Sequence, residues 1–296
     1  AEWKRALNAF LKGQPPSPRL EPEPPSARPP STHRASPRFA ADGGAGMPMG
    51  DAEGVLGSLP IQESPGELVI QPRGQHTHTI IFLHPAGVKA ETYLRLYRRF
   101  GNLAVHYRFV FPRAPMRVAK WHWSVGARGD GLSCWFLPML QDQRPTFIHG
   151  FYQEGERGKE EEVAKEQMDL QAKRIRALID REAKLLNGHY DQIVLGGTSQ
   201  GGSLAAHVAL SLPTDLSALI CCRTIFLARF MQLHERHTRK GAGDGEVPGL
   251  KHKKMPIFVF AGGSDGVHPL QDTRESFARL STDAGYQIEW HVEPNL

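Results

Sequence analysis

The chain has 296 residues, 40% of them hydrophobic and 23% charged, which is enough for one sizeable α/β core and ordinary for a globular protein. No run of about 18 apolar residues occurs, and no charged-then-apolar leader begins the chain, so we expect a cytoplasmic protein without stable membrane insertion. The three cysteines are odd in number and lack metal-ligand spacing, which argues against a disulfide framework or a zinc site.

The net charge of +5 is concentrated at one end of the chain. Residues 1–38 hold seven basic and three acidic side chains, so they contribute +4 of that total. A basic patch indicates nucleic-acid binding only when it lies on a folded face. We therefore expect no nucleic-acid partner.

The first 62 residues have the composition of a disordered tail. Eleven of the 23 prolines fall within the first 60 residues, together with Ser, Arg and Gly. Such a segment buries too little apolar surface to offset the entropy of ordering it. We expect residues 1–62 to be a disordered Pro/Arg-rich tail and residues 63–296 to form the folded domain.

Strand and helix patterns alternate beyond the tail, which is typical of a mostly parallel sheet covered by helices on both faces. The apolar or β-branched runs that predict strands fall at residues 68–70, 79–83, 108–111, 193–195, 219–221, 257–260 and 288–290. The periodic segments that predict helices fall at residues 89–99, 160–186, 202–211 and 271–283. Asn187-Gly188 is a stop signal for the longest of these helices.

The pentapeptide Gly197-Thr198-Ser199-Gln200-Gly201 joins one predicted strand to one predicted helix. In that context it is a nucleophile turn, in which the two glycines let the chain pass and the serine hydroxyl stands clear of the sheet. We predict Ser199 as the nucleophile. The backbone amide of Gln200, at the helix N-terminus, is the first predicted donor to a developing oxyanion.

The second oxyanion donor is expected from the loop after an earlier strand, and the loop Leu83-His84-Pro85-Ala86-Gly87 has the right position in the chain. The backbone N–H of Ala86 is our candidate. We interpret His84 as a residue that orders this loop, because a catalytic histidine follows the nucleophile in this kind of fold.

Asp265 follows the strand predicted at residues 257–260, in a tight glycine-rich loop, and is the candidate for the acid that orients a catalytic imidazole. After Asp265 the chain offers only His268, three residues on, and His291, within the last predicted strand. Either can be an ordinary polar residue. Unless one of these histidines acts as the general base, Ser199 lacks a base and the protein is a non-catalytic binding protein with a hydrolase fold.

An ordered series of motifs resembles the phospholipase/carboxylesterase family, which includes the acyl-protein thioesterases, over residues 66–296. The motifs are Leu83-His84-x-x-Gly87, Phe111-Pro112-x-Ala114-Pro115, Cys134-Trp135-Phe136, Gly196-Gly197-x-Ser199-Gln200-Gly201-Gly202, Pro256-Ile257 and Gly262-x-x-Asp265. The resemblance implies an α/β-hydrolase fold without a large cap domain, in which Trp135 and Phe136 lie near the acyl pocket.

The resemblance also implies the chemistry: a serine hydrolase that cleaves acyl esters, or thioesters of S-acylated proteins, through an acyl-serine intermediate without metal or organic cofactor. Pro85 replaces the glycine that is usual in the family's oxyanion loop. The family histidine follows the last strand in a Gly-His context, whereas here the chain ends soon after that strand, at Leu296. We therefore expect this sequence to be truncated at its C-terminus and to lack that histidine and the final helix.

Overall fold

The computed structural model of the protein describes residues 61–94, 105–117, 131–136, 157–224, 255–282 and 285–295. The tail predicted for residues 1–62 lies outside these ranges, apart from Ile61 and Gln62. These two residues begin strand β1 (Ile61–Ser64), so the described fold starts slightly before the predicted boundary.

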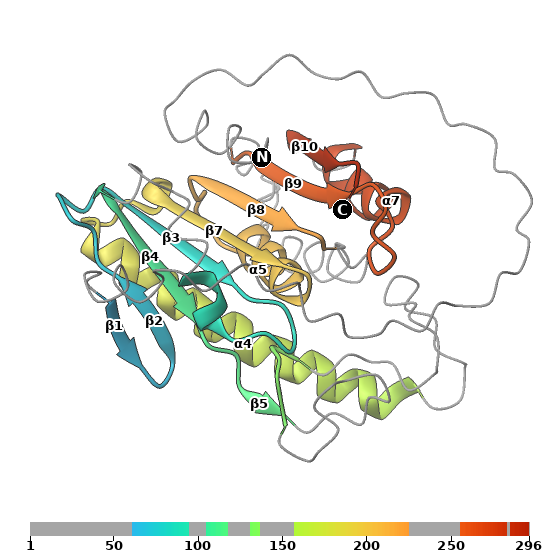
Figure 1. Ribbon diagram of the computed structural model, residues 1–296, viewed down its shortest axis with the longest axis horizontal. Helices are drawn as coiled ribbons and strands as arrows, with labels where there is room; N and C mark the ends of the chain where they lie inside the picture. Colours follow the sequence, from blue (N-terminus) through green and yellow to red (C-terminus); the bar gives the residue numbers. More distant parts are fainter. Residues whose placement is uncertain are drawn as a thin grey trace, which may run out of the picture. The chain divides into compact units, whose positions relative to one another are not determined.

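Eight strands form one sheet in the order β1-β2-β4-β3-β7-β8-β9-β10 (Figure 1). After β1, the strands are β2 (Glu67–Ile70), β3 (His78–Leu83), β4 (Tyr107–Pro112), β7 (Ile193–Thr198), β8 (Ala218–Cys222), β9 (Ile257–Gly262) and β10 (Ile288–Glu293). β2 pairs antiparallel with β1 and β4, and all the other pairings are parallel. Strands β5 (Met116–Arg117) and β6 (Leu132–Ser133) form a separate ribbon. The predicted mostly parallel α/β fold is confirmed.

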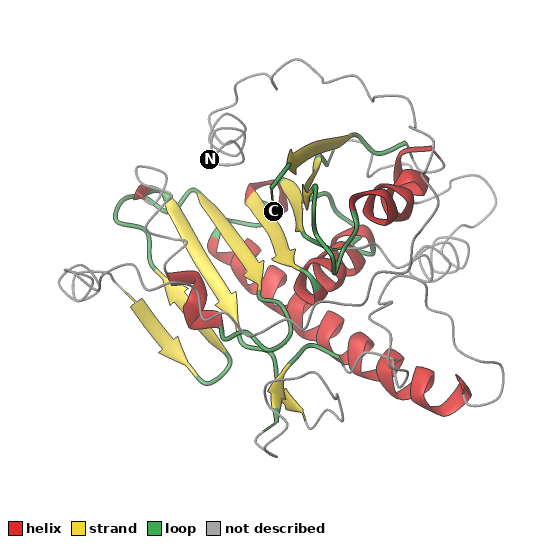
Figure 2. Cartoon of the chain, turned by 45° about the vertical axis from the view of Figure 1, so that its right-hand side comes forward, coloured by secondary structure: helices red, strands yellow, loops and turns green. Residues whose placement is uncertain are grey.

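Three long helices lie close to their predicted positions: α4 (Arg157–Leu185), α5 (Gln200–Leu210) and α7 (Leu270–Thr282). Figure 2 shows them on one side of the sheet. Of the helix predicted at residues 89–99, the described part is the 3-10 turn η1 (Ala90–Tyr93) and Leu94. The rest of that prediction lies outside the described residues.

The core divides between the two faces of the sheet, because successive strand side chains point in opposite directions. Ile81 and Val110 belong to the cluster that also contains apolar side chains of α4, α5 and α7. Their neighbours Phe82 and Phe111 are buried on the other face, where Tyr93 of η1 contacts both rings.

All eleven residues of α5 are buried, including the polar Gln200 and His207. A helix that is buried all round has elements packed on every side. α5 packs on β7 and β8 and also contacts α4. This packing fixes the N-terminal end of α5, which begins directly after Ser199.

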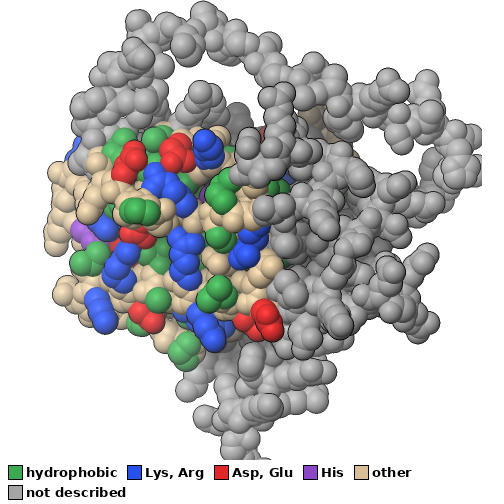
Figure 3. Space-filling model, turned by 90° about the horizontal axis from the view of Figure 1, so that it is seen from below, with side chains coloured by type: hydrophobic (Ala, Val, Ile, Leu, Met, Phe, Trp, Pro, Cys, Tyr) green, Lys and Arg blue, Asp and Glu red, His purple; other side chains and the backbone are tan. Residues whose placement is uncertain are grey.

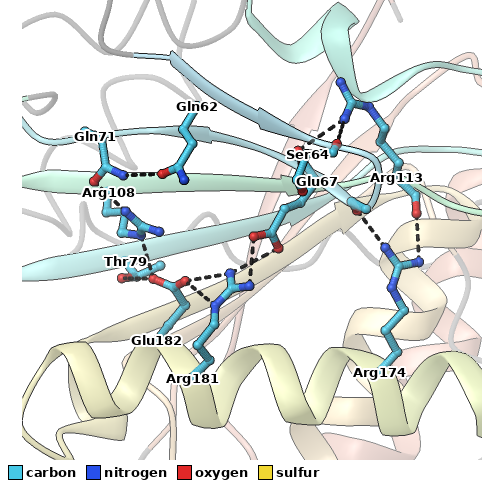
Figure 4. Close-up of polar contacts among 11 residues, drawn as sticks. Gln62, Ser64, Glu67, Gln71, Thr79, Arg108, Arg113, Arg174, Arg181 and Glu182 are labelled. Atoms are coloured by element: carbon cyan, nitrogen blue, oxygen red, sulfur yellow. Dashed lines mark hydrogen bonds and ion pairs between the residues drawn. The ribbon is translucent and has the colours of Figure 1, made fainter.

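Helix α4 is joined to the sheet through Glu182, whose side chain is fully buried (Figure 4). Its carboxylate accepts hydrogen bonds from Arg108 of β4 at 2.8 Å, from Arg181 at 2.8 Å and from Thr79 of β3 at 3.3 Å. Three hydrogen-bond donors compensate for the burial of this carboxylate. The Arg108 side chain is only 11% exposed, and Glu182 neutralises its charge.

Replacing Glu182 with alanine should lower the free energy of unfolding by about 3–5 kcal/mol, because the Arg108 guanidinium would stay buried without its counter-charge. Urea unfolding measures this loss. Lys173→Ala, at an exposed position of the same helix, is the control and should change stability by less than about 0.5 kcal/mol. Equal stability of the two variants would show that the ion pair does not hold α4 to the sheet.

Charged side chains of both signs are interspersed on the face of the molecule drawn in Figure 3. No helix in the described ranges combines the length and the apolar composition that crossing a bilayer requires. α4 has 29 residues, but its sequence is dominated by charged and polar side chains.

Candidate active site

Ser199 lies at the turn between β7 and α5, with φ 51° and ψ −123°. A positive φ is rare for a residue other than glycine and indicates a backbone held in place by its surroundings. The last residue of the neighbouring strand β8 and the segment after it supply these contacts: the Ser199 N–H donates to the Cys222 carbonyl at 2.9 Å, and the Thr224 hydroxyl donates to the Ser199 carbonyl at 2.6 Å. The structure therefore contains the strained strand-to-helix turn that the sequence predicts.

The two glycines of the pentapeptide allow this close passage. A Cβ atom on Gly197 would lie 2.5 Å from the backbone of Gly201, and one on Gly201 would lie 2.5 Å from the Leu83 carbonyl oxygen. Both contacts are with backbone atoms, which cannot move aside cheaply. The glycine spacing is thus a packing requirement between the turn and the end of β3.

Asp265 follows β9, and its side chain is 1% exposed. One carboxylate oxygen accepts the backbone N–H groups of Val267 at 2.9 Å and His268 at 3.0 Å, and the other accepts Nε of Arg223 at 2.7 Å. Burial by itself raises the pKa of Asp265, but the hydrogen bonds from Arg223 and the two amides outweigh it and hold that pKa below its usual value. Asp265 is therefore ionised at neutral pH.

His268 lies between Ser199 and Asp265. Its Nε2 is 3.4 Å from Oγ of Ser199, and its Nδ1 is 3.8 Å from Oδ2 of Asp265. Nδ1 is buried and has no hydrogen-bond partner among the described residues. Burial lowers the pKa of His268, and Arg223 lowers it further against the opposing effect of Asp265, so the imidazole is neutral near pH 7.

His268 is the functional candidate that sequence reasoning left undecided. Its spacing of three residues from Asp265 placed it in the right loop, but no local pattern connects it with Ser199, 69 residues away. The alternative, His291, lies in β10 as predicted, donates from Nε2 to Glu289 Oε1 at 2.9 Å, and stacks on Phe260 with ring centroids 4.8 Å apart.

The role predicted for His84 in ordering its loop is confirmed. Its Nε2 accepts the Ala114 N–H at 3.0 Å, so the proton is on Nδ1, which donates to the Pro85 carbonyl at 2.8 Å. Burial lowers the pKa of His84, in agreement with a neutral ring. Both ring nitrogens are engaged, so His84 is not available as a base.

Gln200 connects the nucleophile turn to the segment of Trp135 and Phe136. Its side-chain oxygen accepts the Trp135 N–H at 2.8 Å, and its side-chain nitrogen donates to the Phe136 carbonyl at 2.6 Å. The Trp135 indole donates to the His84 carbonyl at 2.7 Å. Trp135 is fully buried and Phe136 is 9% exposed, so their clear role in the structure is to hold the two loops together, while contact with substrate stays a prediction.

The two predicted oxyanion donors lie on the loops that Gln200 and Trp135 connect. The Gln200 N–H belongs to the first turn of α5, where amides lack partners within the helix. Gly87 donates to the Ser133 carbonyl at 2.8 Å, whereas the Ala86 N–H donates to no backbone carbonyl in the described residues. The use of both amides for an oxyanion stays a prediction.

Within the described residues, no three His, Cys, Asp or Glu side chains converge as metal ligands would. The cysteines are free, and burial raises the pKa of Cys134 to about 11 and that of Cys222 to about 12. They are therefore neutral thiols near pH 7 and poor nucleophiles.

Ser199 and Asp265 both follow the carboxyl ends of parallel strands, the edge where open α/β sheets place their sites. This sheet and the strand-to-helix turn at Ser199 define an α/β-hydrolase fold. Solved structures agree on the fold: acyl-protein thioesterase 2 of Zea mays matches with a TM-score of 0.55 at 16% identity, covering 78% of this chain and 90% of that one. SOBER1 of Arabidopsis thaliana matches with a TM-score of 0.54 at 19% identity, covering 74% and 90%.

Sequence comparisons point to one family. The model of the phospholipase/carboxylesterase family matches residues 152–281. Acyl-protein thioesterase 1 of Gibberella zeae is 25% identical over 234 residues, covering 77% of this chain and 86% of that protein. Acyl-protein thioesterase 1 of Mycosarcoma maydis is 28% identical over 165 residues, covering 53% and 62%. The chain is thus similar to the phospholipase/carboxylesterase family, as its motifs indicate.

Proposed function

We propose that the protein is a serine hydrolase that cleaves carboxylic esters or thioesters through an acyl-serine intermediate. The observation that carries this proposal is the position of the Ser199 hydroxyl, held at a strained turn with its oxygen 3.4 Å from Nε2 of His268. A neutral imidazole at this separation can reach the proton of the nucleophile when substrate tightens the site.

The proposed reaction has two acyl-transfer steps. As the Ser199 oxygen attacks the carbonyl carbon, His268 Nε2 takes the hydroxyl proton and then gives it to the departing alcohol or thiol. The backbone amides of Gln200 and Ala86 stabilise the oxyanion of the tetrahedral intermediate. Water, deprotonated by the same imidazole, then hydrolyses the acyl-enzyme and frees Ser199.

Asp265 supports the imidazolium that forms during each step. Its ionised carboxylate lies on the Nδ1 side of His268, so the positive charge develops 3.8 Å from a fixed negative one. A movement of the ring by at least about 0.6 Å toward Asp265 would bring this distance within hydrogen-bonding range. We propose this role for Asp265 in place of a simple turn residue.

The names of the relatives support a substrate class. Two matched fungal proteins are acyl-protein thioesterases, which supports S-acylated proteins and acyl esters as substrates, with Trp135 and Phe136 near the acyl group. We also propose a cytoplasmic location, where S-acylated proteins present their thioesters. The proposed steps use no metal and no organic cofactor.

A fluorophosphonate probe tests the proposal, because it labels only an activated serine hydroxyl. The labelling rate of the intact chain should rise with pH and level off, since the imidazole must be neutral to accept the proton. The midpoint should fall below 6.5, the ordinary histidine value, because burial lowers the pKa of His268. Absence of labelling at every pH would favour the non-catalytic binding protein instead.

A further inference from the structure

Arg223 occupies an unusual place at the end of β8. Its φ of 44° lies in the left-handed region, which glycine adopts without strain. The conformation is held by a 2.7 Å hydrogen bond from the Arg223 N–H to the Phe260 carbonyl of β9. A non-glycine residue in such a strained conformation suggests that its side chain has a function.

Among the described residues, the side chain forms an ion pair with Asp265. Nε donates to Oδ2 at 2.7 Å, while the guanidinium is 45% exposed and the carboxylate 1%. Oδ2 is also the oxygen closest to Nδ1 of His268, at 3.8 Å. Arg223 and His268 thus face the same carboxylate oxygen from two different elements.

We propose that Arg223 is a positioning residue of this active site, which holds the Asp265 carboxylate in place behind His268. The inference rests on the proposed hydrolase function and adds to it a residue that the sequence motifs do not indicate. The two backbone amides fix Oδ1, and Arg223 fixes Oδ2. Without Arg223 the carboxylate would be anchored through one oxygen and free to tilt.

Arg223 also acts on His268 through its charge. The charged groups that affect the imidazole are Asp265 on the same loop, which raises the pKa of His268, and Arg223 from the end of β8, which lowers it. Removing the cation should therefore raise this pKa. The neutral, proton-accepting form would then be lost at a higher pH than in the parent protein.

The test compares ester hydrolysis by the full chain and by three variants, Arg223→Gln, Arg223→Lys and Arg223→Gly. We expect Arg223→Gln to lower kcat by about tenfold to a hundredfold with little change in KM, since a misplaced catalytic group costs rate rather than binding. The acid limb of its pH profile should move to higher pH. Arg223→Lys keeps the charge, so its acid limb should stay near that of the parent.

Arg223→Gly is a control for misfolding. Glycine adopts a positive φ without strain, so this variant should unfold at a temperature no lower than that of Arg223→Gln. Arg274→Gln, at an exposed position of α7 where the guanidinium lies over Trp290, is the matched control and should leave kcat and the pH profile unchanged. A parent-like kcat and acid limb in folded Arg223→Gln and Arg223→Gly would overturn the proposal.

A second measurement does not depend on activity. Nuclear magnetic resonance titration of the His268 imidazole in Ser199→Ala and in Ser199→Ala/Arg223→Gln should show a higher pKa in the double variant. An unchanged pKa would refute the role of Arg223 even if the parent hydrolyses esters. If the parent neither hydrolyses esters nor reacts with the probe, the proposed function fails, while the titration still reports on the Arg223, Asp265 and His268 arrangement.

Discussion

Replacing Ser199 with alanine should lower kcat/KM for ester hydrolysis on the order of 10⁶-fold and abolish fluorophosphonate labelling, because no acyl-enzyme can form without the hydroxyl. Alanine keeps the Cβ atom and the strained φ, so the free energy of unfolding should change by less than about 0.5 kcal/mol. Activity is measured with a p-nitrophenyl ester and with a thioester.

Ser211→Ala is the matched control for this experiment. Ser211 ends the same helix, where its hydroxyl donates to the Val208 carbonyl and accepts from Arg176. It lies at the opposite end of α5 from the nucleophile turn, so full activity and full labelling are expected. Labelling that persists in Ser199→Ala would mean that another hydroxyl reacts, and the assignment of the nucleophile would be wrong.

Replacing His268 with alanine should reduce kcat/KM nearly as much, on the order of 10⁶-fold, because members of a catalytic unit act together and removing either one disables the proton transfer. Loss of labelling should accompany loss of turnover. Added imidazole should restore part of the rate, since the substitution leaves space beside Oγ of Ser199 for a free base to enter.

His291→Ala is the control that distinguishes the two histidines which follow Asp265. It removes the stacking on Phe260 and should cost about 1 kcal/mol of stability, with kcat unchanged. If His268→Ala stayed fully active, His268 would not be the base and the proposed mechanism would be wrong.

Most of the fold could be predicted because the sequence patterns that indicate strands and helices lie within short segments of the chain. Each buried parallel strand is a continuous apolar run, and α4 has an apolar stripe, so β3, β7, β9 and α4 were recognisable within a few residues of their bounds. Strand β1 was missed. Its sequence, Ile-Gln-Glu-Ser, is short and polar, and it is a strand only because β2 lies beside it.

Some residues of the candidate site could also be predicted from local sequence, and other contacts in the site could not. Ser199 could be predicted because the glycines at both sides of it are required by the turn itself, and Asp265 because it follows a strand in a tight loop. Gln200 was predicted for its backbone amide, but its side-chain contacts with Trp135 and Phe136 could not be, since they join segments 64 and 65 residues apart.

The sequence by itself determined the class of fold and predicted the candidate nucleophile turn and the candidate acid, because strand periodicity, helix periodicity and glycine sterics act between residues close together in the chain. Only the tertiary structure decided which histidine faces Ser199 and that Arg223 holds Asp265. The carboxyl ends of β7, β8 and β9 meet at one edge of the sheet. Side chains from three separate segments are brought together there by strand order, which leaves no periodic trace in the sequence.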